Sequence, residues 1–149
     1  MHPPLRWLTY GAVLCLLCSC GDSSGPSAIT GDFALATVNG STPPVLVGST
    51  VSCDESIASG TLSLTNDGAF TLSGVVQFDC TRAGGQVQTQ LVGLSGTYAR
   101  NGQSLSFTLP GQGSITARFD GTTLTTTIPA SPFTFPTAVA LAFTLQSAP

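Results

Sequence analysis

The sequence predicts an all-β domain in which an antiparallel up-and-down meander closes into a small barrel. One observation is a period of two between residues 69 and 80, where even positions are mostly apolar and odd positions mostly polar. Another is a set of Asn-Gly and Asp-Gly steps between such runs, which are typical of tight hairpins. No stretch after the first twenty residues shows a convincing helical period. The apolar face of the 69–80 run comprises Phe70, Leu72, Gly74, Val76, Phe78 and Cys80.

The individual strands follow from this alternation and from the turns between the runs. Turn signals stand at Asn66-Asp67-Gly68, Asn101-Gly102 and Asp120-Gly121, because these residues tolerate a positive φ. Asn39-Gly40-Ser41 matches a glycosylation acceptor and is better interpreted as a type I′ turn. Gly93 or Gly96 is expected to mark a bulge in a long fifth strand. Strands are therefore predicted at residues 32–38, 44–53, 60–65, 69–80, 86–100, 104–109, 113–120, 122–128 and 138–146.

Closure into a barrel is favoured over a β-sandwich, which is the alternative. Open edge strands are usually protected by charged residues, Lys especially. This chain has no Lys, and after residue 20 its only positively charged residues are Arg82, Arg100 and Arg118. An immunoglobulin-type sandwich would also pack a Trp beside its cysteine pair, and the one Trp here is Trp7.

The first twenty residues have the layout of a secretory signal. The amino terminus and Arg6 form a short cationic region, and about a dozen largely apolar residues follow it. As a helix, that run would span roughly 18 Å, which is too short for a hydrocarbon core of about 30 Å. A cleaved signal is therefore expected rather than a transmembrane helix.

Three cysteines lie at the end of this segment. The run Leu17-Cys18-Ser19-Cys20 resembles the bacterial lipoprotein signal, which implies that Cys20 is diacylated and becomes the new N-terminus. Cys18 departs from the usual pattern, since a small residue is more common two positions before the lipidated cysteine. Cleavage without lipidation is one alternative. A metal site is another, because Cys15 and Cys18 have zinc-ligand spacing, but a second ligand pair is absent.

The expected organisation is a signal peptide over residues 1–19, a flexible tether over 20–31 and a β-barrel domain over 32–149. Removal of the signal takes His2 and Trp7 with it, so the mature chain has no His and no Lys. No side chain of those types remains to activate a Ser or Thr nucleophile. The net charge of −3 with 7 % charged residues gives no basic surface for nucleic acid.

Cys53 and Cys80 are the remaining cysteines. Both fall on the apolar face of their expected strands, so both can point inward and meet. An exported protein sits in an oxidising compartment, where such a pair persists as a disulfide. Closing a loop of about 28 residues would contribute on the order of 3.5 kcal/mol by the chain-entropy estimate.

Three acids lie near these cysteines, namely Asp54, Glu55 and Asp79. A carboxylate pair could hydrolyse glycosides, and three acids could hold Ca²⁺. Asp54 and Glu55 would point to opposite faces of an extended strand, however, which prevents a shared site. Solvated loop acids are the preferred interpretation, with no metal and no cofactor expected.

A family resemblance rests on the run from Phe33 to Pro44, on "GTLSLTNDGAFTLSG", on "GTYARNGQSLSFT" and on the closing hydrophobic strand. With these segments the chain looks like lipocalin-like barrel lipoproteins of the bacterial envelope. The resemblance covers nearly the whole mature chain and implies a cup-shaped barrel. It carries over no catalytic residues.

The expected function is that of a non-enzymatic envelope lipoprotein, anchored to the membrane, whose barrel holds a small apolar ligand. Gly74 and Gly93 are expected to leave interior room. Phe133 and Phe135 could cap the barrel mouth or simply pack a long loop. The alternative is a surface interaction module with a filled core and a protein partner. The candidate ligand-lining residues are Phe70, Leu72, Val76, Phe78, Phe107, Phe119, Leu141 and Phe143.

Overall fold

The computed structural model describes residues 28–130 and 136–146 and confirms the all-β class. Burial alternates residue by residue over Ser104–Leu109, as the period of two requires, and a 3₁₀ turn lies at Thr81–Ala83. Within the described ranges there is no helix long and apolar enough to span a membrane. The strands are β1 (Gly31–Val38), β2 (Val45–Ser49), β3 (Asp54–Leu64), β4 (Ala69–Asp79), β5 (Val87–Asn101), β6 (Ser104–Leu109), β7 (Gly113–Phe119), β8 (Thr123–Ile128) and β9 (Val139–Leu145).

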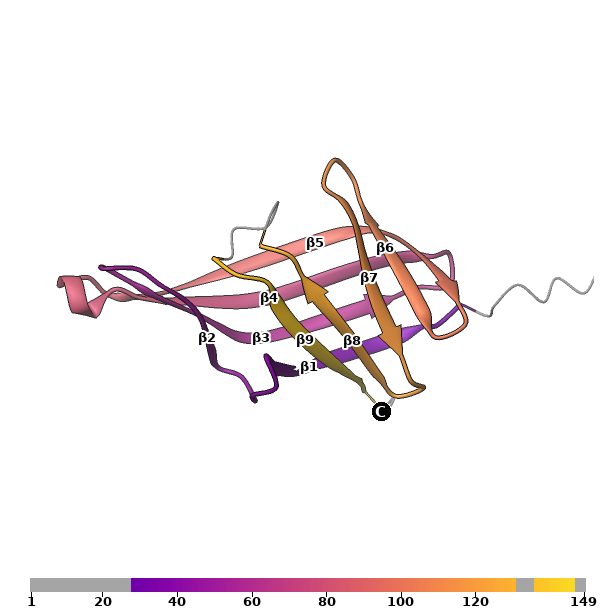
Figure 1. The fold of residues 1–149 in the computed structure, drawn as a ribbon, viewed down its shortest axis with the longest axis horizontal. Helices are drawn as coiled ribbons and strands as arrows, with labels where there is room; N and C mark the ends of the chain where they lie inside the picture. The colour runs from indigo at the N-terminus through magenta and orange to yellow at the C-terminus, as the bar shows by residue number, and fades with distance from the viewer. Residues whose placement is uncertain (1–27, 131–135, 147–149) are drawn as a thin grey trace, which may run out of the picture.

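Eight strands close into an antiparallel barrel, as the sequence predicts (Figure 1). The neighbours run in the order β1-β9-β8-β7-β6-β5-β4-β3, and pairing of β1 with β3 completes the ring. Consecutive hairpins make this topology, which is the meander that the turn signals indicate. The β-sandwich alternative is therefore wrong.

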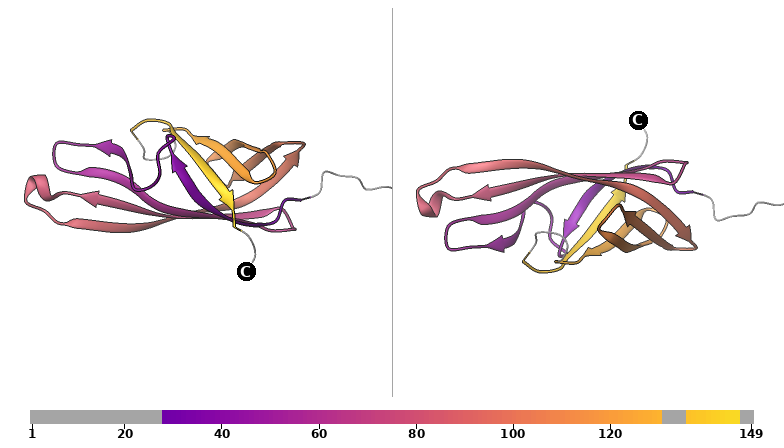
Figure 2. Two further views of the ribbon diagram at one scale, coloured as in Figure 1. Left: turned by 90° about the horizontal axis from the view of Figure 1, so that it is seen from below. Right: turned by 90° about the horizontal axis from the view of Figure 1, so that it is seen from above.

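The barrel continues at one end as a sheet of β2, β3, β4 and β5 (Figure 2). The last part of β3, residues 61–64, pairs with β1 and belongs to the barrel, whereas residues 54–57 pair with β2. β4 and β5 run alongside β3 to the same end. The sheet of β2 to β5 beyond the barrel is called the extension below.

The expected strand at 44–53 was wrong, because the chain turns at residues 50–53 and returns as β3. Thr50 makes this turn: its hydroxyl accepts the N–H of Cys53 at 2.9 Å and donates to the Cys53 carbonyl at 3.0 Å. β3 then begins six residues before the expected start at residue 60. A register shift between Ile57 and Ser59 switches the inward face from odd to even positions and hides the alternation of this strand.

The expected bulge at Gly93 or Gly96 is absent, because β5 pairs with β4 without a register shift from Val87 to Thr97. Gly96 has another role. A Cβ there would lie 2.1 Å from the Thr108 carbonyl oxygen and 2.9 Å from a ring carbon of Phe70. Gly96 therefore permits a close approach between β5 and β6. At this point β5, which until then pairs with β4 alone, begins to pair with β6 as well.

The core fills the barrel and reaches into the extension, where Val47 of β2 and Ile57 of β3 are buried. The Phe33 and Phe119 rings meet edge to face at 5.9 Å, and Phe70 and Phe107 do so at 4.9 Å. Residues 28–31 were expected in the tether, but β1 begins at Gly31 and Ile29 is buried in this core. The fully buried large side chains are Phe33, Phe143, Leu105, Leu124, Val38 and Val139.

The predicted tight turns are confirmed. Asn39 and Gly40 have φ values of 49° and 82°, and Val38 and Ser41 exchange both backbone hydrogen bonds around them. These are the conformations of a type I′ turn. Gly68, Gly102 and Gly121 likewise have positive φ at the other three signals.

Candidate functional site: an apolar pocket at the open end of the barrel

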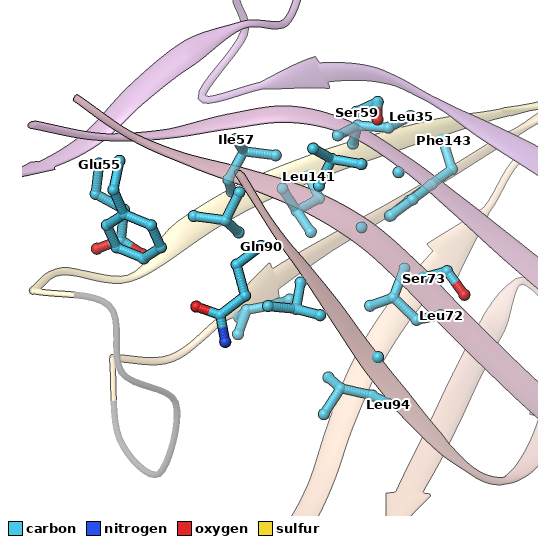
Figure 3. Close-up of a pocket in the computed structure, with 18 of the residues that line it drawn as sticks. Leu35, Glu55, Ile57, Ser59, Leu72, Ser73, Gln90, Leu94, Leu141 and Phe143 are labelled. Carbon is cyan, nitrogen blue, oxygen red and sulfur yellow. The ribbon is translucent and has the colours of Figure 1, made fainter. Parts of the chain in front are cut away.

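A cavity of about 310 Å³ lies where the barrel opens onto the inner face of the extension. Figure 3 shows apolar side chains from β1, β3, β4 and β9 converging on it, with Glu55 at one end and Leu94 towards the other. This volume is at the lower end of the range for small-molecule pockets. The lining residues are Leu35, Glu55, Ile57, Ser59, Gly60, Leu72, Ser73, Gly74, Val75, Val76, Phe78, Gln90, Val92, Gly93, Leu94, Gln112, Ile128, Leu141 and Phe143.

Two features of the strands create this room. Gly60 and Gly74 face each other across β3 and β4, so neither strand fills the space with a side chain at that level. In addition, β5 pairs with β6 only from Thr97 onward, so its earlier half diverges from the β6–β7 hairpin. The inside of the barrel is therefore open beside β5, with Gln112 of the β6–β7 turn lining the pocket.

Five of the eight candidate ligand-lining residues line this pocket: Leu72, Val76, Phe78, Leu141 and Phe143. Two others, Phe70 and Phe107, line a separate void of about 30 Å³ deeper in the barrel. Phe119 lines neither space and packs against Phe33.

The two glycines expected to leave interior room behave differently. Gly74 pairs with Gly60 and with Val92 on the inner face, as expected. Gly93 pairs with Ser73 on the outer face, so its expected interior position is wrong. Gly93 lines the pocket where the backbone of β5 forms the wall.

Among the described residues of the lining, Glu55 is the one charged residue. Burial raises the pKa of its carboxyl group. Among the described residues, no side chain or backbone group donates a hydrogen bond to Glu55 or forms an ion pair with it. The other polar side chains of the lining are neutral: Ser59, Ser73, Gln90 and Gln112.

The interpretation of the three acids as loop residues was wrong, since Asp54 and Glu55 lie in β3 and Asp79 lies in β4. Asp54 and Asp79 face each other across the two strands. Glu55 takes the opposite face, as neighbours on an extended strand must. The three carboxylates therefore share no site, and no cluster of metal-ligating side chains occurs in the described part of the chain.

The outer pair of acids is held at the tip of the extension. Asp54 accepts a hydrogen bond from the Ser49 hydroxyl and forms an ion pair with Arg82, and these contacts lower the pKa of its carboxyl group. Asp79 accepts hydrogen bonds from the hydroxyl and N–H of Thr81, which lower the pKa of that carboxyl group as well. Both acids have structural roles in the turns.

Cys53 and Cys80 form the expected disulfide, with their Sγ atoms 1.99 Å apart. Cys53 directly precedes β3 and Cys80 directly follows β4, so the bond joins the outer ends of these two strands. Their Cα atoms are 4.1 Å apart. The disulfide therefore holds together the sheet that forms one wall of the pocket.

Cys20, Phe133 and Phe135 lie outside the described residues, so their expected roles stay predictions. A search of protein-family models, of curated proteins and of solved structures found no match to this chain.

Proposed function

We propose that this chain is a lipid-anchored, non-enzymatic protein of the bacterial envelope that holds one small apolar molecule at the open end of its barrel. The observation that carries the proposal is the apolar pocket of about 310 Å³, which joins the inside of the barrel to the extension. Burial of apolar ligand surface in such a pocket gains about 25 cal/mol per Å². The chain after residue 19 has no His or Lys, which supports binding rather than catalysis.

The anchor in this proposal is Cys20, and its support is the sequence Leu17-Cys18-Ser19-Cys20. Two or more acyl chains on one residue give the stable attachment that a single chain cannot. The expected intact mass of the membrane-extracted chain lacks residues 1–19 and includes acyl chains on Cys20. Cys20→Ala should abolish this processing, whereas Cys18→Ala should retain it. An unacylated chain from its native host would refute the anchor.

The proposed binding of a ligand in the pocket is tested with two Phe substitutions at neighbouring positions of β5. Val92 lines the pocket and its side chain is 42 % exposed, so Val92→Phe can fill the mouth with little disturbance of the core. Leu91 lies on the opposite face of the strand and is 80 % exposed, which makes Leu91→Phe the matched control.

Binding of 1-decanol to the full chain and both variants is measured by native mass spectrometry in one detergent. The expected result is one decanol per chain in the wild type and in Leu91→Phe, with at least about tenfold weaker binding to Val92→Phe. Equal binding to all three proteins, or none to the wild type, would rule out the pocket as the site.

A further inference from the structure

The position of Glu55 defines the chemistry of one end of the pocket. Its carboxylate lies at the end of the pocket that reaches into the extension, and the apolar side chains of Leu72, Leu94 and Phe143 lie towards the other end (Figure 3). An elongated ligand would therefore place its apolar tail among Leu72, Leu94 and Phe143 and its head beside Glu55. No Arg, Lys or His belongs to the lining that the described residues form.

In the described part of the chain, no cation or hydrogen-bond donor compensates the charge of Glu55. A carboxylate that is partly desolvated and has no ion-pair partner gains from a bound cation or hydrogen-bond donor. A ligand carboxylate would instead place two negative charges together, which opposes binding. We propose, on the basis of the function proposed above, that the ligand is an aliphatic molecule with a cationic, hydrogen-bond-donating head such as a primary amine, and that fatty acids are rejected.

The proposal is tested with three ligands that share one chain length: decylamine, 1-decanol and decanoate. Each is titrated into the full chain and into two variants in the same detergent, so partition into micelles is common to all proteins. Glu55→Gln removes the charge from the pocket. Asp54→Asn removes the same charge from the adjacent residue on the opposite face and serves as the control.

Decylamine should bind the wild type and Asp54→Asn at least about tenfold more tightly than decanoate, a factor worth about 1.4 kcal/mol. In Glu55→Gln that preference should disappear while 1-decanol binds as before. Lowering the pH through the raised pKa of Glu55 removes the charge of its carboxylate, so decylamine binding to the wild type should weaken. Decanol binding without any amine preference would overturn this inference alone, and no binding of decanol would overturn the proposed function.

A second inference rests on a different observation, the free edge of β5. Among the strands of the described residues, β4 alone pairs with β5 from Val87 to Gly96, because β6 begins to pair at Thr97. The N–H of Tyr98 donates to the Gly68 carbonyl on the β4 side. Since hydrogen bonding alternates along an antiparallel strand, the odd-numbered residues 87 to 95 direct their N–H and C=O groups to the free side.

As far as the structure describes the chain, this edge has none of the usual protection. The run from Val87 to Gly96 contains no charged residue and no Pro, and its pairing with β4 has no bulge. Leu91 at its middle is 80 % exposed, and Val87 at its end is 47 % exposed. Such an edge can pair with another strand.

We propose that the partner of this edge is the same edge of a second copy, paired antiparallel about a two-fold axis at Leu91. The residues that direct their N–H and C=O groups to the free side are centred on Leu91. Pairing Val87 with Ser95 and Thr89 with Gly93 of the second copy therefore gives each of these backbone groups a partner, in one symmetric register with roughly ten hydrogen bonds. Because the edge is uncharged, identical copies oppose no like charges. Each Leu91 then covers the other.

Cysteine cross-linking of the full chain tests this register. In Leu91→Cys the two new thiols lie in directly paired residues, about 5.5 Å apart at Cα, which is within disulfide reach. In Val87→Cys the two new thiols would be roughly 27 Å apart, eight residues at about 3.4 Å each. Under mild oxidation, Leu91→Cys should give mostly covalent dimer and Val87→Cys little.

A backbone change provides the second measurement. The N–H of Thr89 points to the free side, so Thr89→Pro blocks the dimer without removing a hydrogen bond to β4. Light scattering should give a dimer for the wild type and a monomer for Thr89→Pro. A wild-type monomer at about 100 µM, or equal cross-linking of Leu91→Cys and Val87→Cys, would overturn the second inference.

Discussion

Gly96 offers a sharp test of how β5 passes from the extension into the barrel. In Gly96→Ala the new methyl group would lie 2.1 Å from the Thr108 carbonyl oxygen and 2.9 Å from the Phe70 ring. The first contact is with backbone, so β5 and β6 must separate locally. Overpacking of this kind typically costs about 1–3 kcal/mol, and we expect Gly96→Ala to lower the free energy of unfolding by about 2 kcal/mol.

The same strand supplies a matched control. A methyl group at Gly93 would meet its nearest neighbour, the Leu72 carbonyl oxygen, at 3.7 Å, which is an ordinary contact. Gly93→Ala should therefore stabilise the protein by about 0.5 kcal/mol, because Ala reduces the entropy of the unfolded chain. Urea unfolding with the disulfide intact should move the two midpoints in opposite directions. A stable Gly96→Ala, or an equal loss in Gly93→Ala, would refute the reasoning.

Three further predictions concern stability. Replacing Cys53 and Cys80 together by Ser should lower the free energy of unfolding in urea by about 3.5 kcal/mol, and no loss would contradict the role of the disulfide. The Tyr98 hydroxyl lies within hydrogen-bond distance of the carbonyl oxygens of Ile29 and Thr65, so Tyr98→Phe should cost about 1 kcal/mol and reduce amide-exchange protection of residues 28–33. The N–H groups of Thr123 and Thr122 lower the pKa of the Asp120 carboxyl group. The contribution of this carboxylate to stability is therefore complete above about pH 4 and is lost as the pH falls through the lower pKa of the folded state. Between pH 5 and pH 2, Asp120→Asn should lose less free energy of unfolding than the wild type.

Much of the fold was predictable because its signals are local. The turn at Asn39-Gly40 depends on the conformations of two residues, and the inward face of β4 follows from its unbroken alternation. The boundary between β2 and β3 was missed because the Thr50 turn contains no Gly, Asn or Pro and because β3 carries a register shift. The free edge of β5 was missed because no local pattern marks that β6 pairs with β5 only from Thr97 onward.

The candidate site was predictable only in part. Leu72, Val76 and Phe78 were found because an apolar side chain on the inward face must border the interior. Whether it borders a cavity or a filled core depends on where β5 leaves β6, and no local pattern encodes that point. Glu55 was assigned to a loop because the start of β3 was misplaced.

Photoaffinity labelling tests the central claim most directly, namely that the open end of the barrel holds an apolar molecule. The full chain is irradiated with decanol that carries a diazirine on its tail, with and without excess decanol, and labelled residues are located by mass spectrometry. Saturable, competed labelling is expected at the inward residues Leu72, Leu94 and Phe143, where the ligand tail is placed. Labelling concentrated on the outward-facing Leu91, or labelling that excess decanol does not reduce, would contradict the claim.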